Sequence, residues 1–376
     1  MTGPLEGVRV VELGGIGPVP FAATHLAELG ADVVRVDRPG EAGPLVLRGG
    51  LRRSRPSVAV DLKHADGVAV VRRLAADADV LLEGFRPGVL ERLGLAPEDL
   101  LAGNPGLVVG RMTGWGQDGP WAQRAGHDIT YAAVSGTLHA MGPTERPGAL
   151  PPLVADFAGG SMYLVAGVLA ALVSRGRTGR GQVVDAAMVD GAAHLMTTVH
   201  AMLGQGAWQD ERGVNLLDGG APYYDTYACA DGRFVAVGAL EPQFWSELVR
   251  VLGVHVEGEQ DDRATWPAQR KAFAAAFATR TRDEWAAVFA GTDACVAPVL
   301  SLAEARDHPQ LAARGTFADG PGYVVPVAGP RFSATPGRSP GEEPRIGADT
   351  ERVLLERGFS ADEVAALVAS GAVHQA

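Results

Sequence analysis

The chain has 376 residues, of which 47% are hydrophobic and 20% charged, and its formal net charge is −11. This length exceeds what one small core needs, so we expect two domains, and the acidic balance argues against general nucleic-acid binding. The two cysteines, Cys229 and Cys295, lie far apart and have no histidine at ligand spacing. We therefore expect small core residues here, and neither a disulfide nor a metal site.

The first part of the chain alternates strands and helices. Short β-branched runs predict strands at residues 8–13 and 31–37, and a run between a proline and a glycine predicts a helix over 20–30. Residues 67–85 repeat helix then strand, and "GLVVGRMTGWG" supplies a further strand. Strands separated by single helices imply a parallel sheet. The expected fold class is α/β, with a Rossmann-like large domain and a smaller α+β domain.

The turn after the first strand, "ELGGIGPVP", partly matches a dinucleotide-binding fingerprint. Asp37 follows at roughly the 20-residue spacing that such a site needs, but Pro20 stands where the third glycine is required. This weak match leaves a glycine-rich turn between a strand and a helix as the simpler interpretation.

A basic segment, "RGGLRRSRPSVAVDLKH", stands out in an acidic chain. Its cations could bind phosphates through planar, bidentate donors, or could line a solvated loop, and the sequence leaves both open. They are Arg48, Arg52, Arg53, Arg55 and Lys63. Arg38 directly follows the second strand, at the strand end where open α/β sheets bind ligands.

The stretch "RAGHDITYAAVSGTL" places His127 and Asp128 at the start of an apolar run with helical spacing. Asp128 could cap this helix, whose packed face would contain Ile129, Ala132, Ala133 and Gly136. A helix N-terminus also favours a developing anion, so the histidine could act beside it. A surface histidine before an ordinary cap is the alternative.

Two carboxylates occupy comparable boundaries later in the chain. Asp156, in "PPLVADFAGG", precedes an apolar run at 162–173 that is too short to span a bilayer and predicts a buried helix. Glu241 ends a strand just ahead of Pro242, which opens the helix "PQFWSELVRVLG". Each of the two could be only a cap or a first-turn acid.

Local signals organise the second half of the chain. Residues 185–206 have continuous helical periodicity, and Asp231-Gly232 predicts a two-residue hairpin between strand-like runs. Capping boxes are predicted from Thr281 with Glu284 and from Ser360 with Glu363. The expected domains are a large one over 1–190 that 330–376 completes, a linker helix over 191–222, a small one over 223–318 and a return linker over 319–345.

Several segments in one order resemble the α-methylacyl-CoA racemases of the family III CoA-transferase (CaiB/BaiF) superfamily. They include "GHDITYAAVSG", "LVADFAGG", "RTGRGQVVDAAMVDG" and "ACVAPVLSLAEARDHPQLAARGTF". The His of "GHD" and the Glu of "GALEPQF" favour the racemases within this superfamily. The resemblance implies that His127 and Asp156 exchange protons with opposite faces of the substrate's α-carbon through an enolate.

The resemblance also implies an interlocked homodimer in which Glu241 of the second subunit supports the imidazole. A backbone donor near Asp128 would hold the enolate oxygen. Coenzyme A would be part of the substrate thioester, with no metal or other cofactor. By position, the CoA contacts would be Arg38, Val60, Asp61, Leu62, Lys63, Gly84, Phe85, Arg86, Arg92, Gly126, Ile129, Thr130 and Tyr131.

The alternatives are a CoA-transferase, in which Asp156 is a nucleophile that forms an acyl anhydride and then an enzyme–CoA thioester, and a CoA-binding protein that has lost catalysis. Since the N-terminus enters a strand directly and "GAVHQA" is no targeting signal, we expect a cytoplasmic enzyme that binds neither membranes nor nucleic acid.

Overall fold

The computed structural model describes residues 3–40, 50–320 and 322–376, so that Arg48 of the basic segment lies outside the described residues. The chain forms two compact units. Unit 1 comprises residues 1–135, 150–195 and 313–376, and unit 2 comprises 136–149 and 196–312. Both units are therefore discontinuous in sequence.

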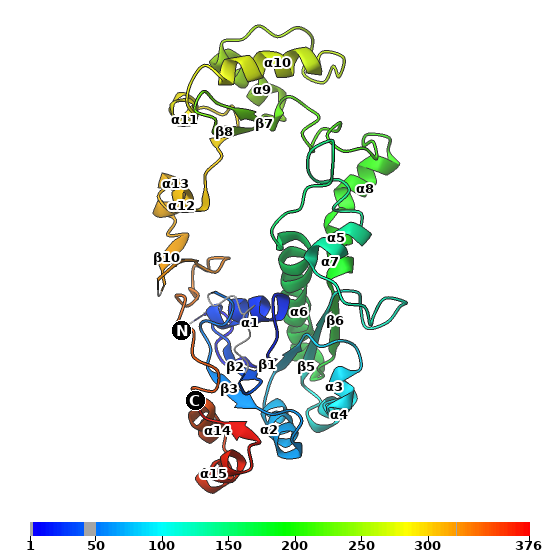
Figure 1. Ribbon diagram of the computed structural model, residues 1–376, viewed down its shortest axis with the longest axis vertical. Helices are drawn as coiled ribbons and strands as arrows, with labels where there is room; N and C mark the ends of the chain where they lie inside the picture. The colour runs from blue at the N-terminus through cyan, green and yellow to red at the C-terminus, as the bar shows by residue number, and fades with distance from the viewer. Residues whose placement is uncertain (1–2, 41–49, 321) are drawn as a thin grey trace. The chain divides into compact units, whose positions relative to one another are not determined.

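Unit 1 is built on a mostly parallel sheet, which confirms the predicted fold class (Figure 1). Within the described residues, its strand order is β12-β3-β2-β1-β4-β5-β6, and only β12 runs antiparallel. The strands are β1 (Arg9–Leu13), β2 (Asp32–Asp37), β3 (Ser57–Val60), β4 (Val80–Glu83), β5 (Val108–Thr113), β6 (Val183–Ala187) and β12 (Val373–His374). Since β1 pairs with both β2 and β4, the winding direction reverses there, as at the ligand-binding point of doubly wound sheets.

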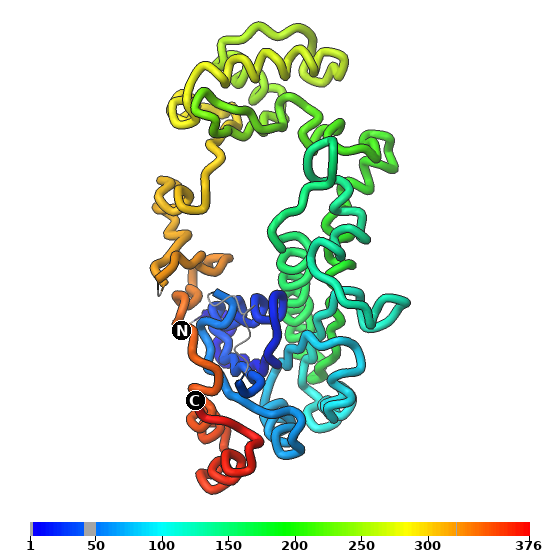
Figure 2. The backbone as a smooth tube through the Cα atoms, viewed as in Figure 1, coloured from blue at the N-terminus to red at the C-terminus, as the bar shows by residue number. Residues whose placement is uncertain are grey.

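Helices cover both faces of this sheet. On one face, α2 (Ala65–Ala76), α14 (Thr350–Glu356) and α15 (Ala361–Ala369) supply apolar side chains to a core shared with β1 to β5, and α3 (Val89–Arg92) and α4 (Pro97–Gly103) complete it. On the other face lie α1 (Pro18–Glu28) and α6 (Tyr163–Thr178). The C-terminal strand β12 returns to pair with β3, so the last residues form one edge of the sheet (Figure 2).

A long helical segment crosses unit 1. A π-helix, η1 (Leu153–Met162), runs directly into α6, so the segment Leu153–Thr178 is longer than the predicted helix at 162–173. By length and apolar composition alone it could cross a membrane, but sheet-covering helices of globular proteins pass the same test. Here one face of α6 is buried against the sheet, where Leu164 and Val168 pack over Gly110 of β5.

Unit 2 has an aromatic core. A sheet of β7 (Tyr224–Ala228), β8 (Phe234–Gly238) and β9 (Val296–Pro298) packs against helices that carry the aromatic side chains. The rings of Tyr227 and Phe277 stack at 5.1 Å, and Trp285 meets Phe277 at 5.3 Å. The helices are α8 (Thr197–Gly204), α9 (Pro242–Leu252), α10 (Trp266–Phe277), α11 (Arg282–Phe289), α12 (Leu302–Ala305) and α13 (Pro309–Ala313), the last of which ends at the unit boundary.

Several local predictions are confirmed. The strands β1 and β2 and the helices α1 and α9 lie within two residues of their expected places, and β4 and β5 lie inside the segments expected to contain a strand. Both capping boxes are present, at the starts of α11 and α15. Between unit 2 and the C-terminal helices the chain forms a short hairpin that was not predicted, β10 (Phe317–Asp319) with β11 (Val324–Pro326).

Other local predictions were wrong. The helical run over 185–206 is broken: its first residues end β6, and α7 (Met188–Leu195) stops before α8 begins. The hairpin turn has three residues, because the amide of Cys229 donates to the carbonyl of Arg233 and Gly232 adopts a φ of 73°. Cys295 is exposed at a φ of 52°, whereas Cys229 is buried as expected.

Two arginines of the basic segment, Arg53 and Arg55, serve the fold, contrary to both the phosphate-binding and the solvated-loop interpretations. Arg55 and Glu12 form an ion pair with Nε–Oε2 2.5 Å, and both side chains are 0% exposed. Arg53 pairs with the buried Glu28 of α1 at 2.5 Å. Since these guanidinium groups are already bound to carboxylates, they hold the 50–55 segment against β1 and α1.

We expect Glu12→Gln to destabilise the protein by about 3–5 kcal/mol, because it leaves the Arg55 charge buried without its partner. Urea-induced unfolding measures this loss. The matched control is Asp77→Asn, which removes an exposed pair with Arg9 and should cost below about 1 kcal/mol. Equal losses in the two variants would contradict the structural role of the buried pair.

Candidate active site

The candidate site lies at the carboxyl ends of the strands of unit 1, where the winding direction reverses. The turn after β1 leads through Gly17, at a φ of 69°, into α1. The loop after β4 begins at Gly84, where an added Cβ would come 2.9 Å from Val19 of α1. The two loops are therefore adjacent, and they border the crevice in which doubly wound sheets bind ligands.

Asp156 lies in the first turns of η1, close to the turn after β1. A Cβ at Gly17 would be 3.5 Å from its carboxylate Oδ2, and Phe157 stacks on Phe21 of α1 at 4.7 Å. The pKa of Asp156 is raised to about 6, mainly by burial and also by the charge of Asp128, and His127 partly opposes this rise. Within the described residues its carboxylate accepts no hydrogen bond. Asp156 is thus a half-buried carboxyl group that can hold or release a proton near neutral pH.

His127 precedes the helix α5 (Asp128–Val134) and has an exposed side chain. The hydroxyl of Thr130 accepts from the His127 amide at 3.0 Å and donates to the His127 carbonyl at 2.7 Å. The backbone of His127 is therefore held at both its polar groups. Because the side chain is exposed, its ring is accessible to a ligand.

Asp128 is the first residue of α5 and does not cap that helix, contrary to the prediction. Its side chain is buried, and its Oδ1 accepts from the amides of Ala155 and Asp156, each at 2.8 Å. The buried face of α5 also differs from the one expected, because Tyr131 and Ala132 are buried whereas Ile129 and Ala133 are exposed. Asp128 thus connects the start of η1 to the start of α5.

Tyr131 is buried against Trp115 and two glycines. Its ring meets Trp115 at 4.8 Å, and a Cβ at Gly114 or Gly126 would lie 2.2 or 2.5 Å from its ring atoms. The pKa of Tyr131 is raised to about 12, mainly by burial and also by the charge of Asp156, and Arg86 partly opposes this rise. Gly126 is therefore required for packing against Tyr131. Gly17, Gly114 and Trp115 were not predicted, because no local pattern distinguishes them from ordinary turn and core residues.

Glu241 belongs to unit 2, where it is exposed between β8 and α9. The buried side chain of Gln260 donates to the carbonyls of Ala239 and Leu240 at 3.1 and 2.7 Å, which fixes the segment just before it. Cys295 lies close enough that burial and then the Glu241 charge raise the pKa of its thiol. Glu241 therefore presents its carboxylate on a rigid part of unit 2.

The residues expected to contact CoA lie along the same edge of the sheet. Arg38 follows β2, Asp61 to Lys63 follow β3 and Gly84 to Arg86 follow β4, whereas Val60 is buried in the core. Arg38, Lys63, Arg86 and Arg92 have exposed side chains. Four cations at the carboxyl edge of a sheet can attract a multiply charged anion, although the whole chain is acidic.

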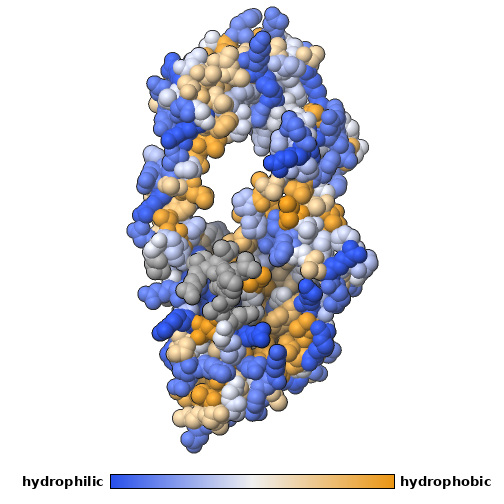
Figure 3. Space-filling view, in the orientation of Figure 1, coloured by the Kyte–Doolittle hydropathy of each residue, from blue (hydrophilic) through white to orange (hydrophobic). Residues whose placement is uncertain are grey.

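Apolar side chains reach the surface around the candidate site. Figure 3 shows orange side chains gathered over α5 and η1. The exposed hydrophobic residues of these two elements are Ile129, Val134, Leu153 and Met162, and Ile16 of the turn after β1 is 74% exposed. An apolar group of a ligand could pack here next to the titratable side chains.

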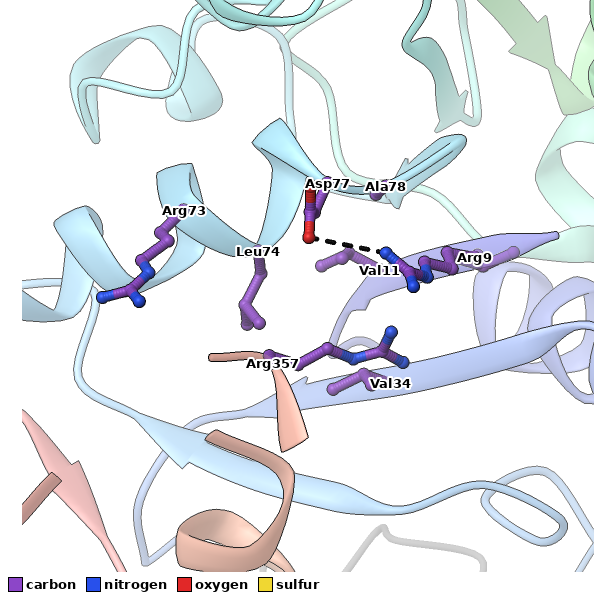
Figure 4. A pocket seen from close by; sticks show the side chains of 9 residues that line it. Arg9, Val11, Val34, Arg73, Leu74, Asp77, Ala78 and Arg357 are labelled. Carbon is purple, nitrogen blue, oxygen red and sulfur yellow. Dashed lines mark hydrogen bonds and ion pairs between the residues drawn. The ribbon is translucent and has the colours of Figure 1, made fainter. Parts of the chain in front are cut away.

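The pocket in Figure 4 is a separate feature at the opposite, amino-terminal edge of the sheet. Its three arginines each have an acidic partner: Arg9 pairs with Asp77, Arg73 with Glu363 and Arg357 with Asp32. These pairs explain its charge without a ligand. Among the described residues, no group of three His, Cys, Asp or Glu side chains is placed to hold a metal ion.

Comparisons with known proteins agree with this architecture. The family model described as CoA-transferase family III matches residues 5–350. The α-methylacyl-CoA racemase of Mus musculus is 47% identical over 96% of this chain and 95% of its own length, and that of Homo sapiens is 46% identical over the same shares. A crystal structure of a CaiB/BaiF family protein from Brucella suis matches with a TM-score of 0.80 at 28% identity, over 95% of this chain and 100% of that one.

We expect Asp156→Asn to be more thermally stable than the parent above pH 6. The folded protein holds the Asp156 proton more tightly than the unfolded chain does, so the parent loses stability as pH rises from the ordinary pKa of 3.8 to about 6. The neutral amide avoids this loss, and its advantage disappears below about pH 4, where both side chains are neutral.

Melting temperatures across pH 4–8 check this. The control, Glu145→Gln, removes an exposed carboxylate and should give no pH-dependent difference from the parent. An Asp156→Asn variant that is less stable than the parent at pH 8 would show that the carboxylate is stabilised, not strained, in the folded protein.

Proposed function

The chain belongs to CoA-transferase family III, and from this membership we propose that it is an α-methylacyl-CoA racemase, an isomerase that inverts the α-carbon of 2-methyl-branched acyl-CoA thioesters. The observation that carries the proposal is the pairing in unit 1 of His127 with a half-buried Asp156 whose pKa is raised to about 6. A carboxyl group that can hold or release a proton near neutral pH, with a histidine close by, is what a proton exchange at carbon requires.

The proposed reaction has two proton transfers. One of the pair, His127 or Asp156, removes the α-proton, and the C–H electron pair moves into the enolate of the thioester. The other group then delivers its proton to the opposite face of the same carbon, which restores the thioester with inverted configuration. Because one group ends protonated and the other deprotonated, the roles are reversed for the opposite epimer.

The enolate oxygen needs a hydrogen-bond donor, because the α-C–H of a thioester is a far weaker acid than an imidazolium or a carboxylic acid. The amides of Asp128 and Ile129, at the start of α5, have no acceptor within the described part of the chain. We assign the Asp128 amide to this oxygen. One such donor is typically worth about 3 kcal/mol to a transition state.

The cations at the carboxyl edge of the sheet would bind the coenzyme A part of the substrate, and the apolar side chains over α5 and η1 would contact its acyl part. No further cofactor enters the proposed reaction. The proposal keeps the cytoplasmic location and the absence of membrane and nucleic-acid partners that were expected from the sequence.

We further propose that the enzyme is an interlocked homodimer in which Glu241 of one subunit supports His127 of the other. A carboxylate next to the imidazole would fix its orientation and stabilise its cationic form. The exposure of Glu241 in the chain supports this assignment, because its carboxylate is free to meet another protomer.

The second candidate is CoA transfer, which the description of the family itself suggests. Asp156 would then attack the thioester carbonyl and form an acyl anhydride, which released CoA would convert to an enzyme–CoA thioester. The free Asp156 carboxylate is the observation that favours it. Hydroxylamine, which captures acyl anhydrides, should inactivate a transferase during turnover and leave a racemase active.

We expect the purified enzyme to exchange the α-proton of a 2-methylacyl-CoA with deuterium from solvent. His127→Ala and Asp156→Ala should each lower the rate by roughly 10²–10⁴-fold, since each removes an acid–base group. NMR or mass spectrometry of the recovered thioester measures the exchange. His255→Ala, which removes an exposed histidine of unit 2, should leave the rate unchanged. No exchange across a broad acyl-CoA panel would refute racemisation.

Mixed dimers test the shared site. When Glu241→Ala and His127→Ala subunits are combined, one site of each heterodimer regains both groups if the glutamate acts across the interface. We therefore expect activity well above that of either variant alone, measured on heterodimers purified with two different tags. Verified heterodimers without recovered activity would place Glu241 outside the partner's site.

A further inference from the structure

Asp128 joins two parts of the candidate site that the chain itself does not connect within unit 1. After α5 the chain enters residues 136–149, which belong to unit 2, and it returns to unit 1 at residue 150, just before η1. The positions of His127 and Asp156 relative to each other thus depend on contacts between α5 and η1. Asp128 supplies two of these, since its Oδ1 accepts from the amides of Ala155 and Asp156 at 2.8 Å each.

These hydrogen bonds are well protected. The side chain of Asp128 is 8% exposed, and Ala155 is fully buried. A hydrogen bond from an amide to a charged acceptor is worth more than one between neutral groups, and burial of such a bond increases its cost of removal. No other described side chain accepts from these two amides.

We propose that the Asp128 carboxylate is a positioning residue for proton transfer, which holds Asp156 at its working distance and orientation from His127 by binding the backbone of η1. The proposal rests on the proposed function, because it assumes that His127 and Asp156 act as the two bases. Asp128 would then have two roles: its amide binds the enolate oxygen, and its side chain positions Asp156.

The same arrangement affects the protonation of Asp156. Amides in the first turn of a helix normally stabilise a nearby carboxylate, but here Asp128 occupies those of Ala155 and Asp156 itself. The Asp128 charge also opposes ionisation of Asp156, whereas His127 favours it. Other titratable groups on the helices that pack against η1 are Tyr131 of α5, His25 and Glu28 of α1, and Asp190 and His194 of α7.

Two substitutions separate position from charge. Asp128→Asn keeps an oxygen that can accept from both amides but removes the charge, whereas Asp128→Ala removes both. We expect Asp128→Ala to lower kcat for α-proton exchange by about 100-fold, the scale of a misplacement of about 1 Å, with KM changed little. Asp128→Asn should retain most of kcat, but the acid limb of its kcat/KM profile should move to lower pH.

The control is Asp218→Asn in unit 2. Asp218 also accepts from backbone amides, those of Gly213, Asn215 and Gly220, and so resembles Asp128 in its bonding. This variant should change neither kcat nor the pH profile. Near-parental kcat in Asp128→Ala, or an unmoved acid limb in Asp128→Asn, would overturn the proposal.

A measurement without substrate separates this proposal from racemisation itself. The thermal stabilities of Asp128→Asn, Asp156→Asn and the double variant, compared with the parent from pH 4 to 8, give the coupling of the two carboxyl groups. We expect the gain from Asp156→Asn to be smaller when residue 128 is Asn. Gains that are equal in both backgrounds would refute the coupling, whether or not any acyl-CoA is racemised.

Discussion

The pairing of β1 with both β2 and β4 is the constraint on which the rest of unit 1 depends. Because all of these strands run in one direction, the loops that leave them emerge at one edge, and the reversal at β1 places the loops after β1 and β4 on either side of a crevice. The buried pair of Glu12 and Arg55 fixes β1 against the 50–55 segment, and its additional bond to Thr24 includes α1 in the same network. The start of α1 then packs against the segment that carries Asp156, through Phe21 and Phe157.

The site combines a carboxylate that destabilises the fold when ionised with well-packed neighbouring residues. Asp156 is half-buried without a hydrogen bond to its carboxylate in the described residues, which is unfavourable when it is ionised. Phe21 stacked on Phe157, Tyr131 packed on two glycines and the bonds from Asp128 hold its surroundings in place. A chain that keeps such a group in a partly apolar position gives up stability for an acid–base group matched to neutral pH.

What the sequence could predict was decided by how far apart the interacting residues lie. Capping boxes such as Thr281 with Glu284 are complete within four residues, and strands such as β4 begin with a continuous apolar run, so both were predicted correctly. The acceptor role of Asp128 was not, because its donors lie 27 and 28 residues away. Likewise the partners of Arg53 and Arg55, Glu28 and Glu12, are far away in sequence, and the arginines alone were equally consistent with phosphate binding.

The late return of β12 to β3 has a consequence for how the protein is made on the ribosome. Unit 2 ends at residue 312, whereas unit 1 needs the strand at Val373–His374 to cover the open side of β3. At ordinary translation rates of roughly 5–20 residues per second, that side stays uncovered for on the order of tens of seconds after β3 emerges. An unpaired strand edge can pair with another chain, so β3 is open to such association until β12 has been made.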